Sequence, residues 1–370
     1  MSDSRPKLWR LNRPRWVSRV EPERYTSPEF LQKELDRVFR RAWQIAGRED
    51  QIPRPGDYFI WEEMHHSVII LRDDRGHVHA FHNTCSHRGS TLLQGQGHIR
   101  HIQCPYHSWS YRLDGSIQHI PKPEGGPDVS HEVLGLKRLQ CQTLGGFVWI
   151  NLDLEAPALF ADQPELLEDW APYRFEEMIP IQQTRIPIGA NWKAMVENVT
   201  DFYHVPAVHS RTISQHAPEG PDFTQFGDHV RQRLDIGAYG WREKLDRACS
   251  RGGPYTEKQA GALHKYLIFP HTVINALPYH LTVMQFIPTE DPNACVLDYA
   301  FYMRRNAKGI ERIRAYATWV ASRIILKEDL DIIDQYQAGL RRAETPAHHL
   351  HDEEKVVACF HGVINRWLES

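Results

Sequence analysis

The sequence predicts an α+β protein of two domains, a small all-β domain followed by a larger one that combines strands with long helices. The chain has 370 residues, more than one average domain, so two hydrophobic cores are expected. Short apolar runs separated by turn residues fill positions 43–155, and long helical patterns fill positions 310–368.

Composition and charge are those of an ordinary globular protein. Hydrophobic residues make up 41% of the chain, charged residues 25%, and the formal net charge is −3. A chain this close to neutrality is not expected to bind nucleic acid or an anionic membrane surface. The first 20 residues are basic but lack the apolar core of a secretory signal, and no apolar run is long enough to span a membrane.

The cysteines indicate a reducing compartment, because their spacing shows no disulfide framework of the small secreted type. A cytoplasmic location is therefore expected, with two cysteines on a metal and four as small core residues. The six are Cys85, Cys104, Cys141, Cys249, Cys295 and Cys359.

Residues 1–42 are expected to form an arm and a helix that pack with the second domain. The arm, up to residue 27, is basic and contains proline. From Ser27 onward the apolar residues follow helical spacing, and Ser27 ahead of Pro28 has the pattern of an N-cap.

The small β domain is expected over residues 43–155. Turn signals separate strand-like runs of about five residues throughout this segment. The turn signals include Pro55-Gly56-Asp57, Asp73-Asp74-Arg75-Gly76, Asp114-Gly115 and Gly145-Gly146, and the runs lie at 58–61, 67–71, 78–81 and 147–150.

Two half-motifs inside this domain, Cys85-Ser86-His87-Arg88-Gly89 and Cys104-Pro105-Tyr106-His107, each pair one cysteine with one histidine. Finger-type zinc sites place both cysteines on one knuckle and both histidines after it. Here each loop supplies a cysteine and then a histidine, which suits a two-iron cluster with two cysteines on one iron and two histidines on the other. This is the ligand set of a Rieske [2Fe–2S] cluster. Structural zinc is the alternative.

The second domain is expected over residues 156–370. A connection at 157–180 contains a short acidic helix at 163–170, a strand follows at 182–188, and a helix runs from 191 through 204. Strand-like residues at 223–240 and 266–303 precede a long helix at 310–340 and a last helix at 353–368. The chain has no G-x-G-x-x-G unit and no P-loop, so electrons for redox chemistry must come from another protein.

A second group of polar residues lies on the helix that begins at residue 191. Asn198, Asp201 and His204 are spaced at intervals of three, which keeps them near one helical side. Pro206 is expected to break the helix, so that His209 can approach His204. Two imidazoles and one carboxylate form the facial triad of non-heme Fe(II) oxygenases, which leaves coordination positions open for O₂. A capped helix with surface histidines is the alternative.

The carboxylate is expected on the long helix, where Glu328, Asp329 and Asp331 are candidates. Asp329 shares a face with an apolar stripe, whereas Asp331 shares a face with Glu328 and other polar residues that are expected to be solvated. An ionised carboxylate is buried only with a partner or a metal, so Asp329 is predicted to be the third ligand. An ion pair with an arginine in the core is the alternative.

These motifs resemble those of the aromatic-ring-hydroxylating oxygenases, α subunits. C-x-H-R-G followed by C-P-Y-H-S-W resembles their Rieske domain, and E-N-x-x-D-x-Y-H-x-x-x-x-H resembles their mononuclear iron motif. E-D followed by Q-x-G-L resembles the segment that carries their ligand aspartate. The resemblance covers residues from about 25 to 345. It implies a [2Fe–2S] cluster on Cys85, His87, Cys104 and His107, and a mononuclear iron on His204, His209 and Asp329.

The same resemblance implies roles for two further residues and an assembly. Asp201 corresponds to a carboxylate that bridges His204 to a Rieske histidine, matched here by His107, across a subunit boundary. Asn198 corresponds to a residue beside the iron. The expected protein is a homotrimer, with or without a β subunit, whose catalytic domain is a helix-grip (START-like) fold with an antiparallel sheet.

The implied activity is that of a terminal oxygenase. It would use O₂, and electrons from NAD(P)H delivered by a separate ferredoxin or ferredoxin reductase, to hydroxylate an aromatic or related small organic substrate. Dihydroxylation and monooxygenation, including oxidative dealkylation, both remain open. The non-enzymatic alternative is a Rieske electron-transfer protein with a ligand-binding domain.

The motifs do not determine the substrate. Relatives acting on quaternary amines often carry Glu where this chain has Asp201, which favours an aromatic substrate, with a quaternary ammonium or N-methyl compound as the alternative. Arg231 or Arg233 could pair with a substrate carboxylate or be solvated. The pocket residues expected from the family are Phe202, Leu234, Ile274, Leu281, Met284 and Phe286.

Overall fold

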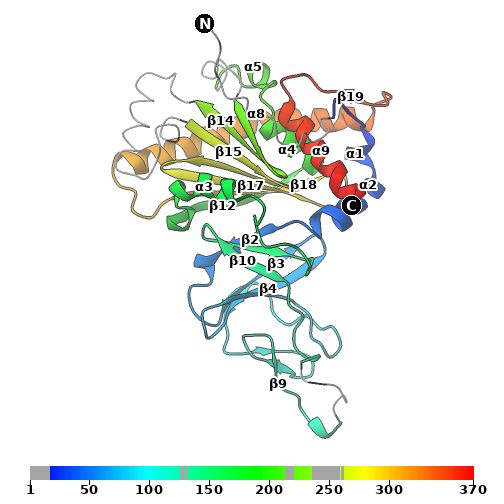
Figure 1. Ribbon diagram of the computed structural model, residues 1–370, viewed down its shortest axis with the longest axis vertical. Helices are drawn as coiled ribbons and strands as arrows, with labels where there is room; N and C mark the ends of the chain where they lie inside the picture. Colours follow the sequence, from blue (N-terminus) through cyan, green and yellow to red (C-terminus); the bar gives the residue numbers. More distant parts are fainter. Residues whose placement is uncertain (1–16, 126–129, 131, 213–220, 236–258, 260–261) are drawn as a thin grey trace. The chain divides into compact units, whose positions relative to one another are not determined.

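The structure of the protein is a computed structural model that describes residues 17–125, 130, 132–212, 221–235, 259 and 262–370. The chain divides into two compact units (Figure 1). The small unit comprises Phe39–Pro164 and Arg174–Glu177, and the large unit comprises Met1–Val38, Glu165–Tyr173 and Met178–Ser370. Residues 1–16 of the arm expected at 1–27 and the strand residues expected at 236–240 lie outside the described residues, whereas the rest of the arm contains β1 (Arg19–Val20), which pairs with β19 (His348–His349), and the short helix α1 (Glu23–Thr26).

The described part of the small unit contains three antiparallel sheets, which confirms the all-β domain that the turn signals predicted. They have the strand orders β10-β11-β2, β5-β4-β3-β6 and β7-β8-β9. The strands are β2 (Gln44–Arg48), β3 (Asp57–Glu63), β4 (His66–Arg72), β5 (Val78–His82), β6 (Gln96–His98), β7 (Ile102–Gln103), β8 (Ser110–Tyr111), β9 (Ile117–His119), β10 (Gln140–Leu144) and β11 (Phe147–Asn151).

Strand β4 is buried on both faces and divides the core of the small unit in two. Ile69 and Leu71 pack in a cluster with Cys85 and Cys104, whereas Val68 and Ile70 pack in a second cluster. Alternate residues of a strand point to opposite faces, so one apolar run supplies both clusters. The two predicted ligand loops therefore begin from the first cluster.

The large unit contains a seven-stranded antiparallel sheet, which confirms the predicted α+β class. Its order is β12-β18-β17-β16-β15-β14-β13. The strands are β12 (Met178–Ile188), β13 (Asp222–Phe226), β14 (His229–Asp235), β15 (Ala262–Ile268), β16 (Thr272–Leu277), β17 (His280–Pro288) and β18 (Cys295–Arg304).

Helices α4 (Trp192–Thr200) and α8 (Ile310–Arg341) cover one face of this sheet, which we call the helix face. Gln232 of β14 donates to the Thr200 carbonyl at 2.7 Å, and Tyr299 of β18 donates to Ser322 of α8 at 2.7 Å. The other face is covered by α3 (Pro164–Trp170) and the turn after it, because Trp170 packs edge-on against Tyr266 at 5.8 Å. The remaining helices in the described part of the large unit are α1 (Glu23–Thr26), α2 (Pro28–Glu34), α5 (Val205–Val208) and α9 (Lys355–Glu369).

Local signals predicted the start of α2 and the extent of α8. The Ser27 side chain accepts from the Phe30 N–H at 3.1 Å, as the N-cap pattern indicated. The buried residues of α8 recur at helical spacing toward the sheet; they are Ala315, Trp319, Leu326, Asp329, Ile333, Gln337 and Leu340. Among the described residues, no helix has the length and apolar character needed to cross a membrane.

The helix expected at 191–204 is shorter than predicted. It ends at Thr200, and Asp201 is an extended C-cap with ψ 141°. Pro206 does not break this helix but lies in the first turn of α5, where its missing N–H costs no hydrogen bond. The prediction that Asn198, Asp201 and His204 share one helical side was therefore wrong, since the chain turns at Asp201.

Candidate metal centres

Helix α4 is held in place by buried polar partners. The Asn191 side chain caps it by accepting from the Lys193 N–H at 2.9 Å. Lys193 Nζ lies 2.8 Å from Glu34 Oε2, and both side chains are fully buried. Removing either charge would leave the other uncompensated in the core, which is costly. These contacts anchor the first turn of α4.

Three potential metal ligands converge in the loop after α4 and on α8. Asp329 Oδ1 lies 3.0 Å from His209 Nε2 and 3.5 Å from His204 Nε2. The three ligand atoms all lie within 4.8 Å of one another. His209 and Asp329 are buried, and His204 is partly buried. Distant parts of the chain thus assemble the two-histidine, one-carboxylate set.

The second nitrogen of each imidazole is held by a further carboxylate. His204 Nδ1 donates to Asp201 Oδ2 at 2.9 Å, and His209 Nδ1 donates to Glu328 Oε2 at 2.8 Å. An ionised carboxylate only accepts hydrogen bonds, so both rings carry hydrogen on Nδ1 and turn Nε2 toward Asp329. This is the orientation of metal-binding histidines whose outer nitrogen is tied to a carboxylate.

The electrostatics of the site favour a positive charge at its centre. Burial lowers the pKa of His204, but the hydrogen bonds with Asp201 and Asp329 raise it to about 9. The pKa of His209 is also raised: burial opposes this, and Asp329 and Glu328 outweigh it. Burial raises the pKa of Asp329, but its two imidazole partners bring it below its ordinary value. A divalent cation would supply the charge that these carboxylates favour, so the site fits a metal ion.

Glu328 was missed by the sequence reasoning, which placed it on a solvated face with Asp331. Asp331 is exposed and pairs with Lys327 at 2.7 Å, as expected. Glu328 instead turns to His209 and also accepts from the Thr212 hydroxyl at 2.7 Å. Its partners come from the loop after α5, and helical periodicity carries no information about that loop.

The expected pocket residues separate between the two faces of the sheet. Leu234, Met284 and Phe286 lie on the helix face with Gln232. Ile274 pairs with Tyr266 and Leu281 pairs with Ala276, so both lie on the face that α3 covers. The structure therefore does not bring Ile274 and Leu281 to the side of His204.

Three other polar or aromatic candidates are also placed by the structure. Asn198 Nδ2 donates to Asp329 Oδ1 at 3.3 Å, beside the triad. Phe202 is partly buried on the helix face, with the Lys265 amine 4.9 Å from its ring centroid. Arg231 is an ion-pair partner of Asp169 at 2.6 Å on the α3 side, rather than a group directed toward the triad.

The two ligand loops of the small unit gather their cysteines and histidines at one end of the unit. Cys85 and Cys104 are buried free thiols that hydrogen-bond to each other. The His87 and His107 ring centroids are 4.7 Å apart, and the His87 ring stacks on Trp109 at 4.8 Å. His87 is exposed and His107 partly buried.

The loops supply hydrogen bonds suited to thiolate sulfur. The backbone N–H of His87 donates to Cys85, whose sulfur also lies 3.1 Å from the Tyr111 hydroxyl. Backbone N–H groups of Tyr106 and His107 donate to Cys104. Such donors stabilise cluster-bound sulfur and tune its potential. Buried thiols with imidazoles at the rim therefore fit a Rieske cluster.

Two family models match the chain, one over each region that carries a candidate metal centre. A family model described as the ring hydroxylating alpha subunit (catalytic domain) matches residues 175–370, and one described as the Rieske [2Fe-2S] domain matches residues 42–140. The chain belongs to the Rieske ring-hydroxylating oxygenases. Its cofactors are accordingly a Rieske [2Fe–2S] cluster and a non-heme iron, with O₂ as co-substrate. Members of this family act on small molecules with electrons from a ferredoxin or reductase.

Relatives of this Rieske oxygenase differ in the substrate that they act on. Choline monooxygenase from Amaranthus tricolor is 29% identical over 331 residues, covering 88% of this chain and 71% of the relative. A solved quaternary ammonium Rieske monooxygenase in complex with its substrate L-carnitine has a TM-score of 0.77 at 21% identity, covering 96% of each chain. A naphthalene 1,2-dioxygenase variant bound to phenanthrene has a TM-score of 0.77 at 20% identity, covering 97% of this chain and 95% of that chain.

Proposed function

We propose that this Rieske oxygenase is a terminal monooxygenase that acts on a small quaternary ammonium or N-methyl compound, at an iron held by His204, His209 and Asp329. The observation that carries the catalytic assignment is the convergence of two imidazole Nε2 atoms on the buried Asp329 carboxylate, each imidazole being tied by a second carboxylate. The substrate class rests on choline monooxygenase and the carnitine-binding structure. The proposed ammonium substrate replaces the aromatic substrate that the presence of Asp201, rather than Glu, had favoured.

The chain's own residues orient and shield the reaction site. When bound, the iron supplies O₂ activation and the cluster supplies electrons one at a time. Asp201 and Glu328 fix the two imidazoles, and Asn198 holds Asp329 through its side-chain amide. Burial of His209 and Asp329 excludes water from the side of the triad that faces the core.

Electrons are proposed to enter through a cluster held by Cys85, His87, Cys104 and His107. In the proposed homotrimer, Asp201 of a neighbouring subunit connects this cluster to the iron of that neighbouring subunit. Asp201 is suited to this role because it holds His204 with one oxygen while its side chain remains 13% exposed. His107, also incompletely buried, is its proposed partner. A sedimentation measurement giving a monomer would contradict the link, because the relay then has no second subunit.

We propose residues 43–155 as the electron-accepting domain and 156–370, with 1–42, as the catalytic domain. A cytoplasmic location is proposed because none of the five described cysteines forms a disulfide.

The substrate proposal is tested by product analysis with a surrogate reductase chain and ¹⁸O₂. Trimethylammonium and N-methyl compounds should be consumed with release of formaldehyde or another aldehyde, and His204→Ala should abolish this while the visible cluster spectrum persists. His101→Ala, at an exposed histidine, is the matched control. A cis-diol from an aromatic substrate, with no turnover of ammonium compounds, would overturn the substrate class. Full activity in His204→Ala would overturn the catalytic assignment.

A further inference from the structure

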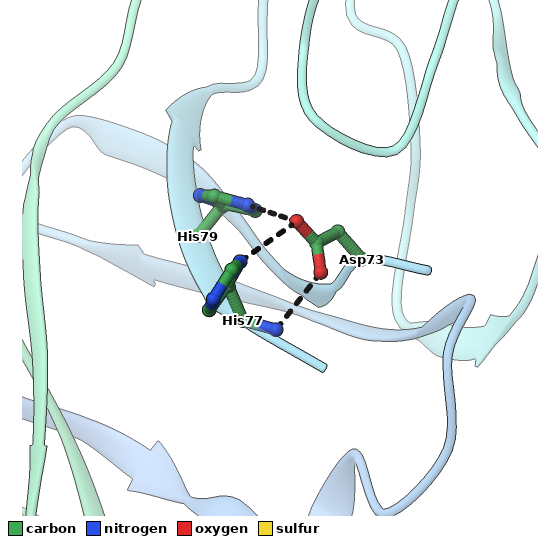
Figure 2. Close-up of side chains that lie close together, drawn as sticks. All are labelled: Asp73, His77 and His79. Carbon is green, nitrogen blue, oxygen red and sulfur yellow. Dashed lines mark hydrogen bonds and ion pairs between the residues drawn. The ribbon is translucent and has the colours of Figure 1, made fainter. Parts of the chain in front are cut away.

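A second group of two histidines and one carboxylate lies in the small unit, apart from the cluster loops. Asp73, His77 and His79 offer ligand atoms that all lie within 4.8 Å of one another (Figure 2). Within the residues that the structure describes, this group and the triad are the two such sets of clustered ligands. The three residues belong to the hairpin that joins β4 to β5.

The hairpin turn directs the Asp73 side chain. Its Oδ1 accepts from the backbone N–H groups of Arg75 at 2.9 Å and His77 at 2.8 Å, which closes the turn. Gly76 has φ +86°, a left-handed conformation that glycine adopts without strain. With Oδ1 engaged by the backbone, Oδ2 is free to face the two imidazoles.

The two histidines face Asp73 from the start of β5. They are two residues apart, which places both side chains on the same side of an extended strand. Asp73 Oδ2 lies 2.8 Å from His79 Nε2 and 3.5 Å from His77 Nδ1. Asp73 is 7% exposed and His79 14%, whereas His77 is 67% exposed. The group is therefore closed on the protein side and open to solvent on one side.

The Asp73 carboxylate is ionised and available as a ligand. Burial raises its pKa, but hydrogen bonds from His79 and from the backbone N–H groups of His77 and Arg75 lower it to about 2.

We propose that Asp73, His77 and His79 form a third metal site, which takes a divalent cation of the zinc type. Two imidazoles and a carboxylate are common zinc ligands, with bonds of about 2.0–2.2 Å. Ligand atoms around a tetrahedral zinc then lie about 3.3 Å apart. The His77–Asp73 distance of 3.5 Å already suits this geometry, and the 2.8 Å contact of His79 opens slightly when a cation replaces its hydrogen. Water completes the open side.

Arg138 makes this site weaker than the iron centre. Its Nη1 lies 3.3 Å from His79 Nδ1, and a guanidinium only donates, so Nδ1 accepts and Nε2 carries the hydrogen without metal. Metal binding at Nε2 moves that hydrogen to Nδ1 and breaks the Arg138 contact. The site is therefore exchangeable rather than permanently filled.

A cation here would stabilise the strand that leads to the cluster. It would join the turn to β5, whose Phe81 packs in the core with Cys85 and Cys104. Arg138 extends this connection, since it lies over the Phe81 ring at 5.5 Å. We expect bound zinc to raise the thermal unfolding midpoint of the small unit. The loss of visible cluster absorbance on heating measures this unfolding.

The test is equilibrium dialysis of the iron-loaded full-length protein against Zn²⁺, with zinc and iron both quantified. The wild-type protein should bind one zinc more than the His77→Gln/His79→Gln double variant, without losing iron. Asp73→Asn keeps an oxygen for the two backbone N–H groups but removes the charged ligand. Asp73→Asn should weaken zinc binding by more than about 100-fold, because losing only an outer hydrogen-bond partner of a ligand typically costs about 10–100-fold.

Two further variants make the result decisive. His101→Gln, at an exposed histidine of the same unit, should bind zinc as the wild type does. His204→Ala should retain the additional zinc, because that ion does not occupy the iron centre. Equal zinc content in the double variant and the wild type, with cluster spectra intact, overturns the proposal. So does zinc uptake matched by an equal loss of iron.

Discussion

The triad His204–His209–Asp329 and the group Asp73–His77–His79 have the same donor types and similarly buried carboxylates, but they differ in how the chain assembles them and in the exposure of one histidine. The first is assembled from a loop and a helix that are far apart in the sequence, and the second from one hairpin. His209 is 2% exposed, whereas His77 is 67% exposed. The same donor types therefore occur once with no strongly exposed ligand and once with one histidine largely in solvent.

The outer partners of the imidazoles differ most. Asp201 and Glu328 hold the Nδ1 atoms of the triad and favour positive charge within it. Arg138 holds the outer nitrogen of His79, and its charge disfavours a cation. We therefore expect the second contact of each histidine, rather than the donor set, to decide how firmly each group holds a metal.

The largest effect is expected from replacing the shared ligand of the triad. Asp329→Asn should lower iron content and turnover by more than about a hundredfold, since loss of an outer partner alone costs about 10–100-fold. Metal analysis and product formation measure this directly. Asp331→Asn, on the solvated side of the same helix, should leave both unchanged. Retention of iron by Asp329→Asn would mean that another group is the ligand.

Asp201→Asn should largely abolish turnover while the cluster spectrum stays intact. The change removes the carboxylate that orients His204 and links it to the proposed intersubunit route. Rapid mixing of the reduced protein with substrate and O₂ measures how fast the cluster is reoxidised, and this rate should fall with turnover. Normal turnover would remove Asp201 from the electron route.

Glu328→Gln should weaken iron binding by about 10–100-fold, because the neutral amide holds His209 less strongly. Equilibrium dialysis with Fe(II) under anaerobic conditions measures the affinity. Thr212→Val removes the other hydrogen bond of Glu328 and should have a smaller effect. Unchanged affinity in Glu328→Gln would show that burial alone orients His209.

Arg138→Gln should strengthen zinc binding at the hairpin by about fivefold, the equivalent of one hydrogen bond of about 1 kcal/mol. The variant removes the guanidinium that competes for His79. Calorimetric titration of the iron-loaded protein measures the change, with Arg112→Gln as a control on a nearby exposed arginine. Weaker zinc binding in Arg138→Gln would reverse the role assigned to this residue.

The buried His280, which has no carboxylate partner among its pKa determinants, should make the folded chain sensitive to acid. Burial and Arg314 lower the pKa of His280 to about 3. Below pH about 6.5 the unfolded chain binds a proton that the folded chain excludes, so stability falls as pH decreases. His280→Asn should reduce this slope by about 1.4 kcal/mol per pH unit. Thermal midpoints between pH 6.5 and 4.5 test it; an unchanged slope would mean that His280 is protonated in the folded state.

Local patterns in the sequence were sufficient to predict most of the candidate metal ligands. Cys85 to His107 could be interpreted from the order of residue types alone, because the spacing of ligands on a loop is a property of the chain. Asp329 was singled out because a carboxylate stands in an apolar helical stripe, and the structure buries it beside His204 and His209. The α+β class followed from turn spacing and helical periodicity.

Only the tertiary structure determined which distant residues come together, because local periodicity contains no information about contacts between separate segments. Strand register placed Ile274 and Leu281 on the α3 side of the sheet, and the loop after α5 brought Thr212 and His209 to Glu328. Pro206 is compatible with either the end or the start of a helix, and the turn at Asp201 determined which occurs. Periodicity determines which residues of a helix or strand share a face, but only packing between distant segments determines which residues that face contacts.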